Sequence, residues 1–294
     1  MESRFGSLEF TMLLPLTTLA LIASITCELH CGEPVVQPQL IDLNIIGGQE
    51  ALPKAFPWQA GLYTKPRFNL PSFNHGSHFC GGALIDNRTV ITAAHCLGMS
   101  ISAVRVHLGS HQRSTKDDGE IFVDIKDVCP HPSWRGQLND IGIVRLDREV
   151  TFTDAIRPIC LPEPNEEVSQ NDKLYVTGWG YTSSGVEQKP AEVLMQARQM
   201  QITKEQCRNL RPTNPEKLIC TLHSRGSSCH GDSGGPLQIK RGKYWQLQGV
   251  VSGGPPICGT PDWPMYYTEV SKYFDWIEAY KKSPNPTFDS SICG

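Results

Sequence analysis

The chain has 294 residues, of which 39% are hydrophobic, so it is long enough to bury one or two complete cores. Its formal net charge is −3 and it contains no basic tract, which argues against nucleic acid as a partner. Eleven cysteines are typical of a secreted protein in which most of them form disulfides.

An apolar stretch, Met12 to Ile25, lies near the N-terminus. It is shorter than the roughly 18 to 20 residues that span a bilayer, and Ser24 to Thr26 offer small residues for cleavage. We therefore expect residues 1–26 to be a secretory signal peptide, the mature protein to be extracellular and no membrane to be a partner. Met1 to Thr11 lacks a basic excess, which leaves a signal anchor as the alternative.

Short β-rich segments recur between turn signals through most of the chain. One of them, Tyr244 to Ser252, follows the turn signal Arg241-Gly242-Lys243. No long helical period precedes the C-terminal region. The pattern therefore favours an antiparallel β fold.

A closing helix is predicted near the C-terminus. Val270, Phe274 and Ile277 recur there at helical spacing, and Ser271 is a suitable N-cap. The tail that follows, Lys281 to Gly294, contains proline and serine residues and is expected to be irregular.

One serine is flanked by small residues in the run Cys229-His230-Gly231-Asp232-Ser233-Gly234-Gly235-Pro236. Such neighbours let the backbone come close to whatever Ser233 contacts. Serine is a weak nucleophile unless a third group orients a general base beside it. Two upstream runs supply a histidine and an aspartate: Thr92-Ala93-Ala94-His95-Cys96 and Asn139-Asp140-Ile141-Gly142-Ile143-Val144.

The order His95, Asp140, Ser233, with gaps of 45 and 93 residues, resembles the chymotrypsin-like (trypsin-fold) serine proteases. The resemblance covers about Ile45 to Tyr280. It implies an all-β fold of two antiparallel six-stranded β-barrels with a C-terminal helix, and an active site in the cleft between the barrels. Five further motifs in the family's order carry it: Ile45-Ile46-Gly47-Gly48, Pro57-Trp58-Gln59-Ala60, Phe79-Cys80-Gly81-Gly82, Gly178-Trp179-Gly180 and Ser252-Gly253-Gly254.

The resemblance assigns the three residues to peptide-bond hydrolysis. His95 takes the proton of Ser233 as the hydroxyl attacks, Asp140 stabilises the imidazolium, and the backbone N–H groups of Gly231 and Ser233 form the oxyanion hole. No metal or organic cofactor is expected. Each residue also has a structural alternative, as an ordinary structural or surface histidine, a turn aspartate and a serine that fills a tight turn.

A zymogen is implied by the same family. Residues 27–44 would be a short propeptide and residues 45–294 the peptidase domain with its irregular tail. Asp232 would pair with the new ammonium group of Ile45, because a buried carboxylate is costly without a partner. The alternative is that Asp232 bonds its own backbone in an Asx-turn.

The residue before the cleavage point departs from the family. Asn44 stands where most relatives have Arg or Lys, and neither residue type occurs between Cys31 and Ile45. The activating protease must therefore accept Asn44, or the protein persists uncut.

The odd cysteine count is explained if Cys27, at the expected signal cleavage site, is removed with the signal. Cys129 and Cys293 have no pairing implied by the family; they pair with each other, or Cys293 forms an intermolecular bond. The resemblance implies four bridges, of which the first tethers the propeptide: Cys31–Cys160, Cys80–Cys96, Cys207–Cys220 and Cys229–Cys258.

The specificity pocket is expected to be apolar. By the family's pattern its base is Ser227, six residues before the nucleophile, where trypsin-like enzymes have Asp. Its walls include Gly254 and Met265, and many relatives have Gly at the second position. A bulky, flexible methionine shortens such a pocket. We therefore expect cleavage after mid-sized apolar residues rather than basic ones.

Gly253 stands where the family usually has Trp. Its absence weakens apolar contacts further from the cut, while substrate can still pair through Ser252 and Gly254. The alternative is that Pro255-Pro256 or Trp263 fills the gap.

Two surface features are also expected. Asn87-Arg88-Thr89 is a glycosylation sequon. The acids within Ser110 to Glu120 lie in the region of the family's calcium loop, but Ser110 replaces an acidic ligand, so we interpret them as a solvated turn.

Taken together, these features predict a secreted serine endopeptidase whose partners are peptide or protein substrates, an activating protease and protein inhibitors. A protease-like regulatory or binding protein with little or no cleavage is the alternative. The complete triad favours the enzyme, whereas Asn44, Gly253 and Met265 favour the alternative.

Overall fold

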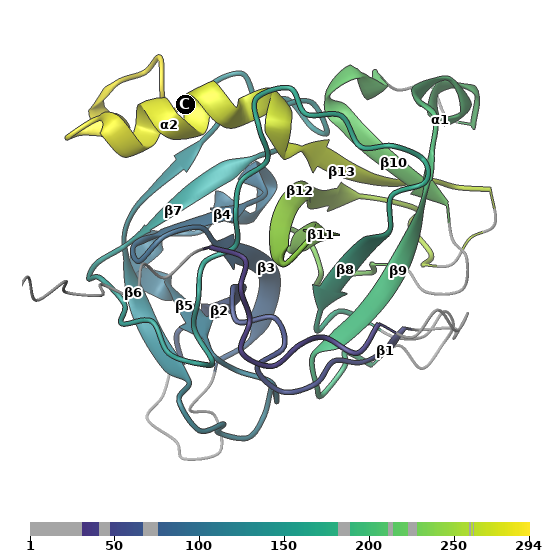
Figure 1. Cartoon of the computed structure of the whole chain (residues 1–294). Helices are drawn as coiled ribbons and strands as arrows, with labels where there is room; N and C mark the ends of the chain where they lie inside the picture. Colours follow the sequence, from purple (N-terminus) through teal and green to yellow (C-terminus); the bar gives the residue numbers. More distant parts are fainter. Residues whose placement is uncertain are drawn as a thin grey trace, which may run out of the picture. The chain divides into compact units, whose positions relative to one another are not determined.

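The computed structural model describes residues 31–40, 48–66, 76–181, 189–210, 214–222, 228–258, 260 and 262–294. The signal peptide, Cys27, the Asn44–Ile45 junction and Ser227 lie outside these ranges. Within them, the strands form the two antiparallel six-stranded barrels that the sequence predicts, so the expected fold is confirmed (Figure 1).

The first barrel closes in the order β2-β3-β4-β7-β6-β5. Along β5, Val104, Val106 and Leu108 alternate with Arg105 and His107, and the aliphatic side chains enter the core, as the pleat of a strand requires. The six strands are β2 (Gln59–Thr64), β3 (His78–Leu84), β4 (Thr89–Thr92), β5 (Val104–Leu108), β6 (Ile121–Pro130) and β7 (Gly142–Leu146).

The second barrel closes through pairing of β8 with β9, and the two-residue strand β1 (Gln49–Glu50) adds to β9 outside the ring. The sequence expected a strand at Tyr244 to Ser252, and β12 covers it with one residue more. The strands are β8 (Leu174–Gly178), β9 (Met195–Ile202), β10 (Leu218–Leu222), β11 (Pro236–Arg241), β12 (Tyr244–Gly253) and β13 (Met265–Glu269).

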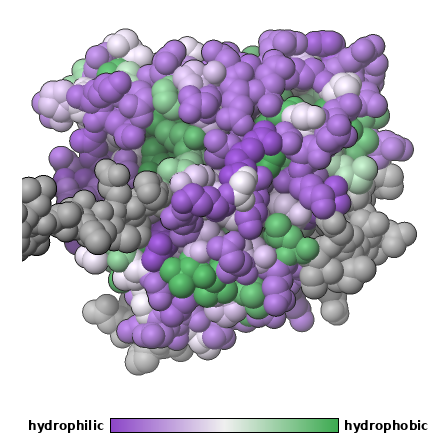
Figure 2. Space-filling model, viewed as in Figure 1, coloured by the Kyte–Doolittle hydropathy of each residue, from purple (hydrophilic) through white to green (hydrophobic). Residues whose placement is uncertain are grey.

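Helices in the described residues are short, and none is long and apolar enough to cross a membrane. The face in Figure 2 is mostly hydrophilic, with separate small hydrophobic areas. The helices are η2 (Ala94–Leu97), η3 (Ile101–Ala103), α1 (Lys204–Leu210), η4 (Pro215–Lys217), η5 (Val270–Tyr273), α2 (Phe274–Lys282) and η6 (Pro286–Phe288).

A buried polar network joins the barrels. Trp58, just before β2, donates from Nε1 to Gln238 Oε1 on β11 at 2.5 Å. Gln238 Nε2 donates to Thr177 Oγ1 on β8 at 3.1 Å, and Thr177 donates in turn to Gln59 Oε1 on β2 at 2.6 Å. These three hydrogen bonds link β2 and the residue before it to β8 and β11, so the network fixes the relative position of the two barrels.

The C-terminal helix returns to the first barrel. Tyr280 of α2 donates to Asp127 Oδ1 on β6 at 2.7 Å and accepts from Arg145 Nε on β7 at 3.1 Å. The prediction of Ser271 as its N-cap is wrong. Ser271 lies inside η5, and its hydroxyl donates to the carbonyl oxygen of Glu166, a contact remote in sequence.

The tail after α2 is largely irregular, as expected, but it is held in place. Trp276 Nε1 donates to the Ile292 carbonyl oxygen at 2.7 Å, and the backbone N–H of Gly294 donates to Pro130 O at 3.1 Å. Cys293 pairs with Cys129 within the chain, so the intermolecular alternative is not what the structure contains.

The described residues contain five disulfides. The bridge between Cys31 and Cys160 ties the segment before the expected cleavage point to the second barrel, where Gly32 O also accepts from the Trp245 backbone N–H at 2.9 Å. The pairs are those expected from the sequence: Cys31–Cys160, Cys80–Cys96, Cys129–Cys293, Cys207–Cys220 and Cys229–Cys258.

Candidate active site

His95 and Asp140 meet at two points. His95 lies on η2, just after β4, and Asp140 lies just before β7. The imidazole Nδ1 is 2.7 Å from Asp140 Oδ2, and the backbone N–H of His95 donates to Asp140 Oδ1 at 3.0 Å. The carboxylate therefore fixes both the ring and the backbone of the histidine.

The second barrel supports the aspartate. Ser252 on β12 donates from Oγ to Asp140 Oδ2 at 2.7 Å, and Thr268 on β13 donates from Oγ1 to the Asp140 backbone oxygen at 2.8 Å. Asp140 is only 1% exposed, so these bonds, with those from His95, replace the water that it loses. Ser252, expected to bind substrate backbone, thus also holds Asp140.

Ser233 lies in the turn before β11, and this turn packs against the first barrel. The Ser233 carbonyl oxygen accepts from the backbone N–H of Gly81 on β3 at 2.7 Å. Gly234 has φ of +80°, and a Cβ there would fall 2.2 Å from Thr92 Oγ1, at the end of β4. Only glycine allows this approach, which brings the Ser233 turn to the strand end that leads into His95.

Gly231, the other expected oxyanion donor, has φ of +95°, a conformation that favours glycine. A side chain at this position would strain the backbone. Glycine is therefore the residue type that suits this turn. Its left-handed backbone sets the direction of the Gly231 N–H group.

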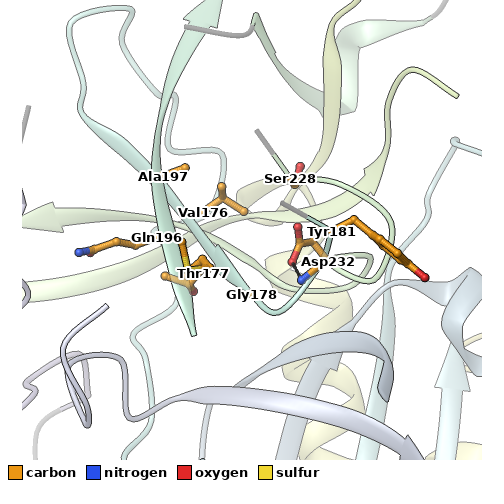
Figure 3. A pocket seen from close by; sticks show the side chains of 10 residues that line it. Val176, Thr177, Gly178, Tyr181, Gln196, Ala197, Ser228 and Asp232 are labelled. Atoms are coloured by element: carbon orange, nitrogen blue, oxygen red, sulfur yellow. Dashed lines mark hydrogen bonds between the residues drawn. The ribbon is translucent and has the colours of Figure 1, made fainter. Parts of the chain in front are cut away.

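Asp232 lines a cavity of about 20 Å³ in the second barrel (Figure 3). Its oxygens accept from the backbone N–H groups of Gly180 and Cys229, both at 2.8 Å. Neither bond is the contact to a residue two positions on that defines an Asx-turn. The cavity is lined by Val176, Thr177, Gly178, Gly180, Tyr181, Met195, Gln196, Ala197, Ser228 and Asp232.

The cavity is shaped around this carboxylate. A Cβ at Gly178 or Gly180 would fall 2.0 Å or 2.4 Å from an Asp232 oxygen. Burial raises the pKa of Asp232 to about 6, against the lowering effect of its two backbone hydrogen bonds. Among the described residues no cation forms an ion pair with it. Asp232 is therefore a buried carboxylate with two neutral donors and no countercharge from any residue that the structure describes.

Met265, expected from the sequence as a wall of the specificity pocket, lies on β13. A Cβ at Gly254 would fall 2.3 Å from Met265 Sδ, so the methionine side chain lies directly against this glycine. Met265 is 4% exposed. The base position, Ser227, lies outside the described residues.

Gln137 is a neighbour that the sequence did not indicate. Its Nε2 lies 3.0 Å from the place where a Cβ of Gly253 would stand, and apart from the two chain neighbours of Gly253 no other described side chain comes within 4 Å of that point. Pro255, Pro256 and Trp263 do not come within 4 Å of that point. A contact between the barrels, 116 residues apart in sequence, leaves no local signal.

The prediction of a solvated turn is wrong for two acids of the Ser110 to Glu120 segment, Asp117 and Glu120, whereas Asp118 is exposed. Asp117 accepts from the backbone N–H groups of His111 and Gln112 at 2.7 Å each. Glu120 Oε2 lies 3.1 Å from His107 Nε2, and both side chains are buried. These carboxylates hold the loop together from within.

Comparison with known proteins agrees with this geometry. Residues 45–277 match the family described as Trypsin. Chymotrypsin-C of Mus musculus is 34% identical over 279 residues, which cover 90% of this chain and 98% of that protein. Chymotrypsin-C of Bos taurus is 35% identical, covering 84% and 92%. Phenoloxidase-activating factor 1 of Holotrichia diomphalia is 37% identical, covering 80% and 69%.

The Asp232 carboxyl group predicts an unusual pH dependence of the uncut chain. Its pKa of about 6 in the folded state lies above the ordinary 3.8, so the folded chain keeps a proton that the unfolded chain has lost. The free energy of unfolding should therefore fall as pH rises from about 4 to about 6, by roughly 3 kcal/mol from this group alone.

Urea titrations at pH 4 and pH 6.5 on the uncut protein and on Asp232→Asn measure this contribution. The variant should lack it, so the difference in stability between the two proteins should change by that amount between the two pH values. A constant difference at both would show that Asp232 is not a buried carboxyl group with a raised pKa.

Proposed function

The chain belongs to the trypsin family of serine proteases, and we propose that it is a secreted endopeptidase made as a zymogen that hydrolyses peptide bonds with His95, Asp140 and Ser233. The observation that carries the proposal is the pair of contacts that the Asp140 carboxylate makes with the ring and the backbone N–H of His95. A buried carboxylate at 2.7 Å from Nδ1 holds the neutral imidazole with its proton on that nitrogen. Nε2 is then the atom free to act as a base.

The chemistry follows from that tautomer. Nε2 of His95 removes the hydroxyl proton of Ser233 as Oγ attacks the peptide carbonyl carbon, and Asp140 stabilises the imidazolium that forms. The backbone N–H groups of Gly231 and Ser233 receive the oxyanion, and each such donor is worth about 3 kcal/mol in comparable enzymes. The imidazolium then protonates the leaving amine. Water, activated in the same way, releases the acyl group, and no cofactor takes part.

Activation would depend on Asp232. Cleavage between Asn44 and Ile45 creates an ammonium group near the start of β1, and a cavity of about 20 Å³ has room for a group the size of a water molecule. The ammonium would give the Asp232 carboxylate the countercharge that it lacks. The propeptide, residues 27–44, would stay attached through Cys31–Cys160.

Secretion is supported by the five disulfides, which form and persist in oxidising compartments. We assign residues 1–26 to a signal peptide and place the mature protein outside the cell. Asn87, in the turn between β3 and β4, is the proposed glycosylation site. The partners would be protein or peptide substrates, an activating protease that accepts Asn44, and protein inhibitors.

A regulatory protein without cleavage activity is the second candidate. One relative is named for activating phenoloxidase. The uncompensated Asp232 and the residue Asn44 would suit a chain that stays uncut. Reactivity of Ser233 separates the two candidates.

Replacing Ser233 by Ala should abolish labelling by a fluorophosphonate probe in protein cut before Ile45, because the probe bonds to the activated hydroxyl. Secretion and the disulfides should be unchanged. Ser100→Ala, an exposed serine bonded to Ser102, is the matched control and should label as the unsubstituted protein does. Equal labelling of the Ser233→Ala protein would remove the assignment.

The primary specificity should be apolar because Met265 closes the wall beside Gly254. Met265→Gly should shift cleavage of a peptide library from Leu, Met and Val toward Phe and Tyr, by roughly tenfold in the ratio of kcat/KM values. Met200→Gly is the control, since Met200 is 55% exposed on β9.

A dominant preference for Arg or Lys would contradict the proposed pocket. It would mean that another acidic side chain reaches the bottom of the specificity pocket. Glu269 is poorly placed for this, because Lys204 Nζ already binds its carboxylate at 2.9 Å.

A further inference from the structure

A second cavity, of about 230 Å³, lies between the barrels beside the residues that precede Asp140. Residues 137–139 of the first barrel form one side, and residues 214 and 216–218, around η4, form the other. The volume is below the roughly 300 Å³ at which pockets for drug-sized ligands begin, so it suits one or two side chains. Nothing in the proposed triad or specificity pocket uses it.

The charges around this cavity are unequal. Arg208 on α1 binds Glu216 Oε1 at 2.8 Å, and Lys204 binds Glu269 at 2.9 Å. The other charged residue of the lining, Lys217, forms no ion pair with a carboxylate in the described part of the chain.

The ammonium group of Lys217 is held but not neutralised. Its Nζ lies 3.4 Å from Asn139 Oδ1 and 5.1 Å from the centroid of the Tyr273 ring. Asn139 Oδ1 also accepts from the Tyr273 hydroxyl at 3.0 Å. Because an ammonium has three donors, this single long hydrogen bond leaves donor capacity at the cavity. Its field is felt locally, since burial and then Lys217 lower the pKa of His131 to about 4.

Gln137 connects the cavity to the candidate active site. It lines the cavity, and its amide also lies against Gly253 at the end of β12. The neighbours of Gly253, Ser252 and Gly254, are the residues expected to pair with substrate backbone. An extended peptide along this edge advances about 3.3 Å per residue and alternates its side chains, so a residue shortly before the scissile bond passes the cavity.

We propose that this cavity binds an acidic side chain of the substrate, two to four residues before the scissile bond, through the ammonium group of Lys217. The inference rests on the proposed protease function and names the substrate class that the function would take. Leu138, 44% exposed at the cavity, would contact the aliphatic part of that side chain. Gln137 would supply amide hydrogen bonds where relatives have an aromatic wall.

A paired-peptide assay tests the proposal. Peptides that differ only in Asp, Asn or Lys at each of these three positions are cleaved by the Ile45-started enzyme at low ionic strength. Exposed ion pairs correspond to factors of up to about fivefold, so Asp should exceed Asn by about three- to fivefold in kcat/KM at one position. The preference should shrink in 0.5 M salt, where charges are screened over about 4 Å.

Two variants of Lys217 separate charge from shape. Lys217→Gln should remove the preference, and Lys217→Glu should reverse it so that the Lys peptide is favoured. Lys116→Glu makes the same charge change at an exposed position of the first barrel and should keep the preference for Asp. A merely structural role of Lys217 cannot produce the reversal.

Binding of the same peptides to the Ser233→Ala protein, measured by fluorescence polarisation, makes the test independent of catalysis. Cleavage with equal use of Asp and Asn, or a Lys217→Glu protein that still prefers Asp, overturns the acidic subsite and leaves the protease function intact. Absence of cleavage together with tighter binding of the Asp peptide supports the cavity and overturns the protease function. Equal binding of the Asp and Asn peptides by Ser233→Ala overturns the acidic subsite whether or not cleavage occurs.

Discussion

The carboxylate of Asp140 is the interaction on which the arrangement of the site depends. It binds the ring and backbone of His95 in the first barrel, and it accepts from Ser252 in the second. A buried charge left without partners costs about 3 to 5 kcal/mol, so neither barrel can move away from this group without a large loss. The same bonds that hold the barrels together at this point hold His95 in the orientation that a general base requires.

A second buried carboxylate, Asp232, has the opposite character. The carboxylate of Asp140 has three hydrogen bonds, whereas that of Asp232 has two backbone donors and no cation in the part of the chain described. The raised pKa of Asp232 expresses the cost of that environment. The Asp140 carboxylate thus already has its hydrogen-bond partners in the uncut chain. The Asp232 carboxylate would gain a charged partner only from a new ammonium group. This contrast is the physical basis of the proposed activation.

Much of the fold and the contact between His95 and Asp140 could be predicted because family motifs are local. The runs around His95, Asp140 and Ser233 each occupy a few consecutive residues, and the β-rich pattern with a closing helix matched the barrels and α2. The failures involve contacts remote in sequence. Ser271 bonds to Glu166, and Gln137 reaches Gly253, without any local signal. Likewise, the sequence predicts Glu120 as a solvated acid, but the fold buries it against His107.

The most direct test of the account is the reactivity of Ser233 before and after a defined cut. Asn44→Arg allows trypsin to cleave before Ile45, and N-terminal sequencing confirms the new end. The rate of fluorophosphonate labelling should then rise by orders of magnitude, and it should stay low in the cut Asn44→Arg, Asp232→Asn double variant. If correctly cut protein with a free Ile45 amine labels no faster than the uncut chain, pairing of that amine with Asp232 does not activate the protein.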